Sequence, residues 1–361
     1  MSGPEDKVGI GILGAAGIAK KNARGISLTR NGLEVVAVGS RTLAKSEAFI
    51  KEVEGAHDAT PYGSYEEVLD DPRVIAVYIP LPTSMHVQWV EAAAAKGKHV
   101  LLEKPIAMTN EDADIMLKAC SEAGVQLMDG TMWMHNPRAS LMRSVLDDAR
   151  AVGLLRSVTS SFFFPASESF LKGDIRMSKD LDGLGCLGDM GWYNTRAALW
   201  VYDFEMPQYV QACPGYIFTK GDVLLYCAAT LIWTGGRRAH IECGFDRAGV
   251  QYLEAAGSSG SIRLEDFVIP RTEKVSQFQV RDGKFLEDNA TRVAQSAEER
   301  TVHLDRPQET LMWEAFGRCI RSIRAGGSPD EHWPKIAALT QRVILAIEQS
   351  ARNGGSRVDL T

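Results

Sequence analysis

Lys104, Asp189 and Tyr193 are residue types that together could move a proton and stabilise charge during hydride transfer. Lys104 follows the short apolar run 100–102, which predicts a buried parallel strand. Such strands end at the ligand crevice of an open α/β sheet, so a lysine there can reach a bound ligand. Pro105 has a fixed φ and disfavours the α region for Lys104, which restricts where the ammonium points. The alternative is a lysine that only extends to water.

Asp189 and Tyr193 lie in the glycine-rich segment 183–193 and are four residues apart. If this segment is helical, both side chains share one face. A tyrosine beside a cationic lysine can have its pKa lowered, and it can then exchange a proton with a substrate hydroxyl. The alternatives are that Asp189 only complements a helix dipole and that Tyr193 only packs.

A glycine-rich turn at residues 9–19 lies between a strand pattern and a helix pattern. Gly14, Ala16 and Ala19 occupy the three positions at which a dinucleotide-binding fingerprint carries small residues. These positions allow a tight turn, a close backbone approach to a pyrophosphate and close packing of helix and strand. The segment therefore predicts a nucleotide-binding turn, with alanine at two of the three positions.

The residues after the second predicted strand, 33–39, indicate which nucleotide is bound. An acidic residue at this point would read the ribose hydroxyl of NAD, but the chain carries Ser40 and Arg41 instead. A guanidinium favours a 2′-phosphate, so we predict NADP, with NAD less favoured. Lys45 could add a second positive charge. The alternative is that Arg41 is a solvated loop residue.

The first part of the chain alternates strand and helix patterns, which predicts an α/β domain with a parallel sheet over residues 1–130. Its predicted strands include 74–79, 99–102 and 125–128, with helices at 86–95 and 111–123.

From residue 131 to 361 the pattern changes to closely spaced runs rich in β-branched and aromatic residues: 157–164, 209–214, 223–233, 238–245, 252–256 and 261–269. These runs predict an α+β domain with a largely antiparallel, open-faced sheet. Residues 272–303 are polar and aperiodic, and we expect a long loop there. Helices are predicted at 309–325 and 335–351, the second able to pack back on the first domain. Because a one-faced sheet leaves a face to cover, we expect a homodimer or larger oligomer.

Composition excludes several classes of protein. The 361 residues are 45% hydrophobic and 24% charged with a net charge of −6, and they contain no basic tract, so nucleic acid and anionic membranes are not expected partners. No apolar leader or membrane-length apolar stretch occurs, and we expect a cytoplasmic protein. The six cysteines show no metal-binding spacing, so neither a metal site nor a disulfide framework is predicted.

The order of these motifs resembles the Gfo/Idh/MocA family of oxidoreductases over essentially the whole chain. The resemblance is carried by the glycine turn, the run 82–86, Glu103-Lys104-Pro105, the Asp189-to-Tyr193 element and the run 257–262. A tyrosine at position 193 is similar to the dihydrodiol dehydrogenase and glucose–fructose oxidoreductase branches, and other motifs resemble a plant-type group of uncharacterised oxidoreductases.

The resemblance implies a Rossmann domain, a C-terminal sheet that often forms the oligomer interface, and an active site between the domains. It also implies that Lys104 touches substrate and nicotinamide and that Tyr193 transfers the proton, with Asp189 as the competing proton carrier. The predicted cofactor contacts are Gly14, Ala16, Gly17, Ile18, Ala19, Ser40, Arg41, Lys45, Leu81, Pro82, Thr83, His86, Glu103 and Lys104. For His86 a helix-start residue without a functional role is the alternative.

Residues near the domain boundary are candidates for the substrate pocket. Trp133 and Arg176 are the predicted substrate contacts, and Arg138 is a further candidate. Trp133 could instead be core, and each arginine could be a surface residue. The predicted function is NADP-dependent hydride transfer between the nicotinamide and a carbinol or carbonyl carbon of a sugar, cyclic polyol or diol. Two alternatives stay open: a catalytically idle NADP-binding regulator or scaffold, and a glycosidase that uses NAD transiently.

Overall fold

The computed structural model describes residues 7–285 and 293–360, which divide into two compact units. The first unit contains the described residues up to His135 together with Arg306–Ala338, and the second contains the rest. The boundary therefore lies a few residues after the predicted position 130, and a segment from near the C-terminus belongs to the first unit.

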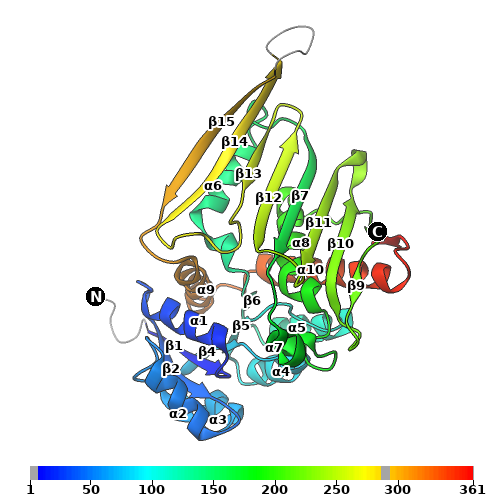
Figure 1. Cartoon of the computed structure of the whole chain (residues 1–361). Helices are drawn as coiled ribbons and strands as arrows, with labels where there is room; N and C mark the ends of the chain where they lie inside the picture. The colour runs from blue at the N-terminus through cyan, green and yellow to red at the C-terminus, as the bar shows by residue number, and fades with distance from the viewer. Residues whose placement is uncertain (1–6, 286–292, 361) are drawn as a thin grey trace. The chain divides into compact units, whose positions relative to one another are not determined.

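The first unit is built on a parallel sheet of six strands in the order β3-β2-β1-β4-β5-β6 (Figure 1). The strands are β1 (Val8–Leu13), β2 (Leu33–Gly39), β3 (Thr60–Tyr62), β4 (Val74–Ile79), β5 (His99–Leu102) and β6 (Leu127–Asp129). Every residue of β1 and β5 is buried, which explains why these sequences are apolar apart from His99 at the start of β5. The strand order reverses between β1 and β4, and ligands of such sheets bind at the carboxyl ends of the strands at this point.

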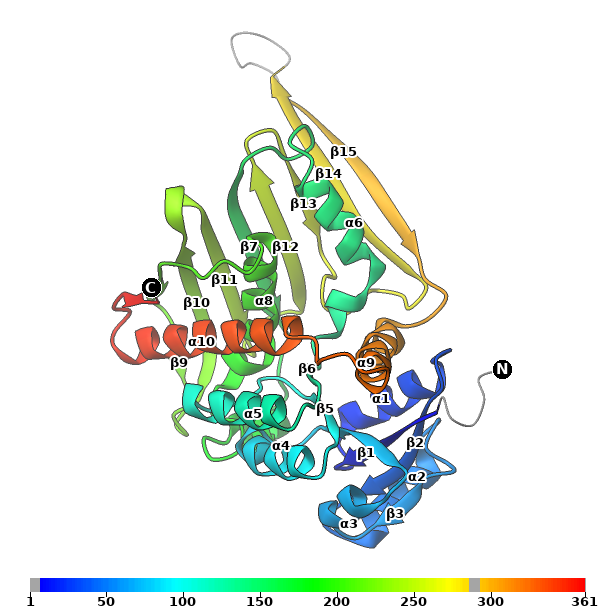
Figure 2. The same ribbon diagram turned by 180° about the vertical axis from the view of Figure 1, so that it is seen from behind.

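Six helices complete the first unit: α1 (Gly17–Ser27), α2 (Leu43–Glu52), α3 (Tyr65–Asp70), α4 (His86–Ala95), α5 (Asn110–Glu122) and α9 (Gln308–Arg324). Helix α9 lies beside α1, as Figure 1 and Figure 2 both show, although residues 28–307 separate the two helices in the sequence. Helix α10 (His332–Arg352) passes from the first unit into the second. The helices predicted at 86–95, 111–123, 309–325 and 335–351 are confirmed as α4, α5, α9 and α10.

The second unit is built on a ten-stranded sheet in which β7 and β11 run parallel to each other and the other strand pairs that the structure describes are antiparallel. Its strands are β7 (Leu155–Phe163), β8 (Tyr209–Ala212), β9 (Ile217–Phe218), β10 (Leu224–Ile232), β11 (Arg238–Gly244), β12 (Val250–Gly257), β13 (Gly260–Leu264), β14 (Val275–Phe285), β15 (Val293–His303) and β16 (Val358–Asp359). The helices of this unit are α6 (Pro137–Leu146), α7 (Glu168–Gly173) and α8 (Trp192–Val201). The predicted fold class, a Rossmann domain plus a domain with a mostly antiparallel sheet, is confirmed.

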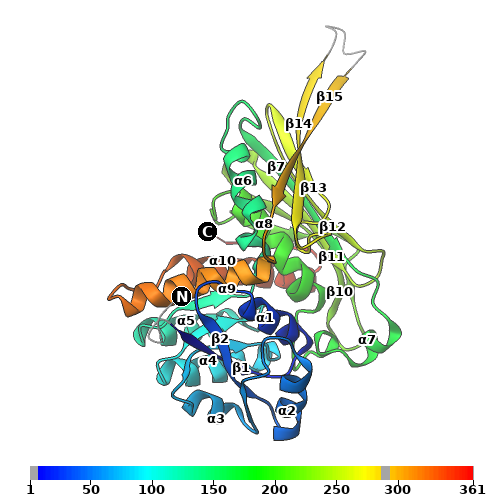
Figure 3. The same ribbon diagram turned by 90° about the vertical axis from the view of Figure 1, so that its left-hand side faces the viewer.

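One face of this second sheet is covered by helices and the other is open (Figure 3). Helix α8 is completely buried, and its Asn194 lies 3.0 Å from the Ser160 hydroxyl of β7. Since side chains alternate along a strand, Thr159 and Ser161 point to the opposite, open face. Tyr226, His240, Tyr252 and Arg263 lie on the same open face by register, and each is only partly buried.

The prediction of a long loop at 272–303 was wrong, because β14 and β15 form a hairpin paired from Val275↔His303 to Phe285↔Val293. Apolar alternation is weak here because every side chain from 296 to 301 is exposed. Backbone hydrogen bonds and a few anchors such as Phe278, which is 2% exposed, hold the hairpin. A strand that is solvated on both faces leaves no hydrophobic period to detect.

Buried His99 should make the stability of the protein fall on acidification. Its Nδ1 accepts a hydrogen bond from the Gln126 N–H at 2.9 Å, and burial, aided by the charge of Arg324, lowers the pKa of His99 to about 4. Between this value and the usual pKa of about 6.5, the unfolded chain binds a proton that the folded chain does not. We expect His99 to account for a loss of about 2 kcal/mol in the free energy of unfolding between about pH 7 and pH 5.

Urea unfolding at each pH measures this effect. The variant His99→Asn keeps an acceptor near the Gln126 N–H but cannot titrate, so its stability should fall less on acidification. His303→Asn, which replaces an exposed histidine of β15, is the matched control. Parallel pH profiles for the parent protein and His99→Asn would contradict this assignment.

Candidate functional site

The turn after β1 has the backbone that a nucleotide-binding turn requires. Gly14 has a φ of +123°, and its N–H donates to the Gly39 carbonyl at 2.9 Å. A Cβ at this position would lie 3.0 Å from the Leu81 side chain. Ala16 caps α1, whose first N–H groups have no acceptor within the helix and so favour an anion. The predicted contacts from Gly14 to Ala19 thus surround a helix N-terminus suited to a pyrophosphate.

The turn after β2 carries positive charge. Ser40 is 4% exposed and its N–H donates to the Tyr62 carbonyl at 3.3 Å, whereas Arg41 and Lys45 are exposed. Burial raises the pKa of Tyr65, and the positive charge of Arg41 partly opposes this rise. The first turn of α2 has no acidic residue. This end of the sheet therefore fits a 2′-phosphate better than a free ribose hydroxyl.

The loop after β4 is held by His86, which is 1% exposed. Its Nδ1 lies 2.9 Å from the Ile106 carbonyl and its Nε2 lies 3.0 Å from the Leu81 carbonyl. Through these two contacts, His86 connects the loop after β4 with the loop after β5. This arrangement gives His86 a clear structural role, while the predicted cofactor contacts of Leu81, Pro82, Thr83 and His86 stay predictions.

Glu103 and Lys104 follow β5 directly, at the same edge of the sheet as the glycine turn. The Glu103 N–H donates to the Ile79 carbonyl at 3.2 Å. Its carboxylate accepts hydrogen bonds from the Tyr78 hydroxyl at 2.5 Å and from the Lys104 N–H at 3.2 Å. The Lys104–Pro105 peptide bond is cis. Lys104 is thus presented from a well-defined backbone at the carboxyl end of the parallel strands.

In the second unit, Asp189 lies in a π-helical turn, Leu187–Gly191, immediately before α8. Tyr193 occupies the first turn of α8, so the two side chains do not follow the regular α-helical spacing that we expected. Gly191 lies between them against the sheet, where a Cβ would come within 2.7 Å of Leu187 and 3.1 Å of the Cys243 sulfur. The glycines of this segment therefore let it pack closely on the sheet.

Asp189 forms an ion pair with Arg176, a residue that the sequence predicts to contact the substrate. The Arg176 Nε lies 3.0 Å from Asp189 Oδ2, and its Nη1 lies 3.0 Å from Asp174 Oδ1. Attraction to Asp189, more than to Asp174, raises the pKa of Arg176 above its usual value. The guanidinium thus already binds two carboxylates.

Tyr193 is 6% exposed, and its ring centroid lies 5.9 Å from that of Phe162. Phe162 in turn contacts Phe267 with a centroid distance of 6.5 Å. Aromatic packing of this kind fixes the direction of the Tyr193 ring. Trp133, the other predicted substrate contact, is 3% exposed on a 3₁₀ turn of the first unit, Met132–His135.

Both parts of the chain match known protein families. Residues 8–131 match the model of an oxidoreductase family with an NAD-binding Rossmann fold, and residues 141–263 match the GFO/IDH/MocA C-terminal domain. The chain belongs to the GFO/IDH/MocA family. It is therefore an oxidoreductase, as the sequence predicted.

Two similar members of this family are named as enzymes that act on sugars. The chain is 32% identical to D-xylose 1-dehydrogenase (NADP(+)) 2 of Haloferax volcanii over 96% of its own length and 98% of the relative's. It is 34% identical to dTDP-3,4-didehydro-2,6-dideoxy-α-D-glucose 3-reductase of Streptomyces antibioticus, over 75% of this chain and 80% of that enzyme. The branch within the family stays a prediction.

A crystal structure with a similar fold is the 3-ketoreductase of Actinomadura kijaniata in complex with TDP-benzene and NADP. It has a TM-score of 0.78 and 24% identity, covering 95% of this chain and 98% of that one. The aldose–aldose oxidoreductase of Caulobacter crescentus complexed with glycerol superposes with a TM-score of 0.80 and 24% identity, covering 98% and 100%.

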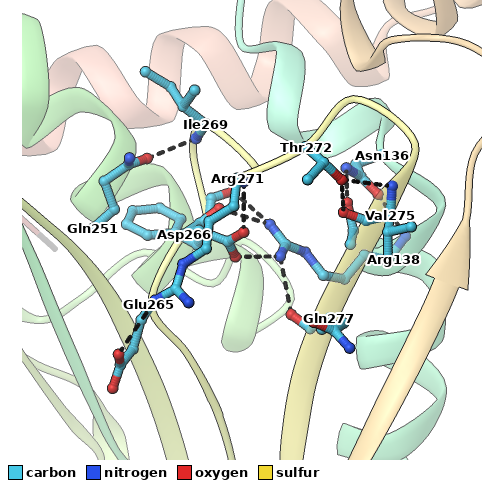
Figure 4. Close-up of polar contacts among 12 residues, drawn as sticks. Asn136, Arg138, Gln251, Glu265, Asp266, Ile269, Arg271, Thr272, Val275 and Gln277 are labelled. Carbon is cyan, nitrogen blue, oxygen red and sulfur yellow. Dashed lines mark hydrogen bonds and ion pairs between the residues drawn. The ribbon is translucent and has the colours of Figure 1, made fainter.

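Arg138 of this GFO/IDH/MocA protein is 2% exposed, and its guanidinium is used inside the second unit (Figure 4). It donates to Asp266 Oδ1 at 2.5 Å, to the Gln277 carbonyl at 3.0 Å and to the Asp266 carbonyl at 2.9 Å. The neighbouring Asn136 bonds Ser276 at 2.9 Å. These contacts give Arg138 the structural role of holding the loop between β13 and β14.

Among residues 7–285 and 293–360, no group of three or more histidine, cysteine or acidic side chains is arranged to hold a metal ion. Within the same residues, no helix is both long and apolar enough to span a membrane. All six cysteines are free thiols.

Proposed function

We propose that the protein is an NADP-dependent oxidoreductase that transfers a hydride between the nicotinamide and a carbinol or carbonyl carbon of a sugar, cyclic polyol or diol. The observation that carries this proposal is the placement of Lys104 after β5, at the sheet edge where the glycine turn and Arg41 also lie. The NADP-dependent xylose dehydrogenase and the sugar 3-reductase support the same cofactor and substrate class.

The residues of the first unit fit such a cofactor. Gly14 leaves room for the backbone to approach a pyrophosphate, the N-terminus of α1 favours its charge, and Arg41 suits a 2′-phosphate. When bound, NADP supplies or accepts the hydride. Ser40 and Lys45 stay predicted contacts at the ribose end.

In this proposal the protein itself handles the proton and the substrate oxygen. Tyr193 takes the proton from the hydroxyl during oxidation and returns it to the carbonyl oxygen during reduction. Lys104 donates to the same substrate oxygen and stabilises the negative charge that develops there. Asp189 has Arg176 as its partner, which favours Tyr193 over Asp189 as the proton-transfer group.

A substrate panel tests the proposal. Reduction of NADP⁺ would be followed with aldoses, cyclic polyols and diols, and oxidation of NADPH with the matching carbonyl compounds. NADPH binding would be measured in parallel by fluorescence titration. Turnover on at least one compound class is expected. Firm binding without turnover on any compound would contradict hydride transfer and support the idle NADP-binding regulator.

We also propose that two copies of the chain pair through the open face of the second sheet. On this face Arg247 stacks on Phe163 and Tyr226, at 4.6 and 4.4 Å from the ring centroids, and Arg263 lies 4.9 Å from the Tyr252 ring centroid. Partly buried aromatic and arginine side chains are typical of interface centres.

Light scattering should return about twice the monomer mass of 39.5 kDa at micromolar concentration. Tyr226→Asp would place a charge at the centre of the face and should shift the protein toward the monomer. A monomer mass for the parent protein would contradict the proposal. The cytoplasmic location stays a prediction.

A further inference from the structure

A chain of three hydrogen bonds, two buried and the last partly buried, connects helix α9 with Glu103 inside the first unit. The Trp313 Nε1–H donates to Asn22 Oδ1 at 2.8 Å, and Asn22 Nδ2 donates to the Tyr78 hydroxyl at 2.8 Å. The Tyr78 hydroxyl donates to Glu103 Oε1 at 2.5 Å. Asn22 is 1% exposed, and Tyr78 and Trp313 are fully buried. The Glu103 carboxylate is thus the last acceptor of the chain.

The direction of this chain follows from the chemistry of its groups. An indole N–H can only donate, so the Asn22 side chain must turn its oxygen toward Trp313 and its amide nitrogen toward Tyr78. That nitrogen also donates to the Ile18 carbonyl at 3.2 Å. The single hydroxyl proton of Tyr78 is then directed to Glu103. Because each donor is assigned, the network supports one orientation of the Glu103 carboxylate.

Packing restricts both Tyr78 and the carboxylate to which it donates. The rings of Tyr78 and Trp313 meet edge to face with centroids 5.6 Å apart. On another side lies Gly130, where an added Cβ would be 3.1 Å from Glu103 Oε1. Glu103 Oε2 accepts from the Lys104 N–H at 3.2 Å. A shift of the Tyr78 hydroxyl would therefore be transmitted to Glu103 and to the backbone of Lys104.

We propose that Tyr78 is a positioning residue for the cofactor site: through the Glu103 carboxylate it aligns the Glu103–Lys104 element for NADP, and Trp313 and Asn22 hold it in place. This inference rests on the NADP-binding function proposed above. In this proposal helix α9 supports the cofactor site, because its Trp313 holds Asn22. Helix α9 belongs to the segment 306–338, which is part of the first unit although it lies near the C-terminus of the chain. A tyrosine whose only role is core packing could donate its hydroxyl proton to a backbone carbonyl, as Tyr202 does to the Arg238 carbonyl at 2.9 Å.

Fluorescence titration with NADPH on the full chain tests this role without the need for a substrate. Tyr78→Phe removes only the hydroxyl, and we expect it to weaken NADPH binding by about tenfold, since hydrogen bonds to charged groups are the stronger class. Trp313→Phe keeps an aromatic ring but loses the N–H, and should weaken binding by about threefold. In a Glu103→Ala background, Tyr78→Phe should have no further effect, because Tyr78 acts through that carboxylate.

Tyr202→Phe is the matched control, because it removes a buried tyrosine hydrogen bond in the other unit. Urea unfolding should show a similar loss of stability in both tyrosine variants, whereas NADPH affinity should fall only in Tyr78→Phe. Unchanged affinity in Tyr78→Phe, or a full additional loss in the double variant, would overturn the positioning role. A parent protein that binds NADPH but turns over no substrate overturns hydride transfer alone, and a parent that binds no NADPH overturns both proposals.

Discussion

Tyr193→Phe is expected to leave NADP binding nearly intact and to lower kcat by about 10² to 10⁴, the usual span for a general acid–base group. The substitution removes the hydroxyl but keeps the ring that packs on Phe162. Binding and chemistry should therefore separate. Lys104→Ala should instead reduce both substrate affinity and kcat, because Lys104 is assigned to positioning and to charge stabilisation.

The pH dependence of the reaction provides a second measurement on the same variants. In the oxidative direction, the rate of the parent enzyme should rise toward alkaline pH as the tyrosine and lysine together lose a proton. That rising limb should move or disappear in Tyr193→Phe. Stopped-flow or steady-state NADPH absorbance across the pH range would record both profiles.

Asp189→Asn is the matched comparison for the proton-transfer assignment. The Asp189 carboxylate is 3.0 Å from the Arg176 Nε, so its substitution should disturb the ion pair and the packing of the π-helical turn. We expect a partial loss of activity without a change in the position of the alkaline limb. An inactive Asp189→Asn, together with turnover of Tyr193→Phe within about threefold of the parent, would move the proton to Asp189.

Arg41→Asp is expected to reverse the cofactor preference from NADP to NAD. In the parent protein, a charged contact with the 2′-phosphate contributes about 1.5 to 3 kcal/mol, so NADP should bind at least about tenfold more tightly than NAD. An aspartate would repel that phosphate and accept a hydrogen bond from a ribose hydroxyl. Arg41 is exposed, so its replacement should cost little stability.

Isothermal titration of both nucleotides would measure the ratio of affinities. Lys45→Ala is the graded comparison, since this lysine is also exposed but is assigned a secondary role, and it should weaken NADP binding without reversing the preference. Equal affinities of the parent protein for NADP and NAD would contradict the assignment of Arg41.

The first unit could be predicted well because buried parallel strands are continuous apolar runs and its turns need particular small residues. Gly14 illustrates the point, since its positive φ of +123° belongs to a turn whose local pattern is visible in the sequence. The hairpin of β14 and β15 could not be predicted in the same way. Backbone hydrogen bonds pair the two strands, and the side chains of β15 from 296 to 301 are all exposed, so this strand leaves no hydrophobic period.

The sequence by itself determined which residues are available for chemistry: Arg41 after the second predicted strand, Lys104 after the apolar strand 99–102, and Tyr193 beside a glycine-rich turn. Only the tertiary structure decided their partners. Arg176, a predicted substrate contact, forms an ion pair with Asp189, and Trp313 donates to Asn22, which lies 291 positions away in the sequence. Side-chain contacts between distant segments depend on how helices and strands pack, and local sequence patterns carry no record of that packing.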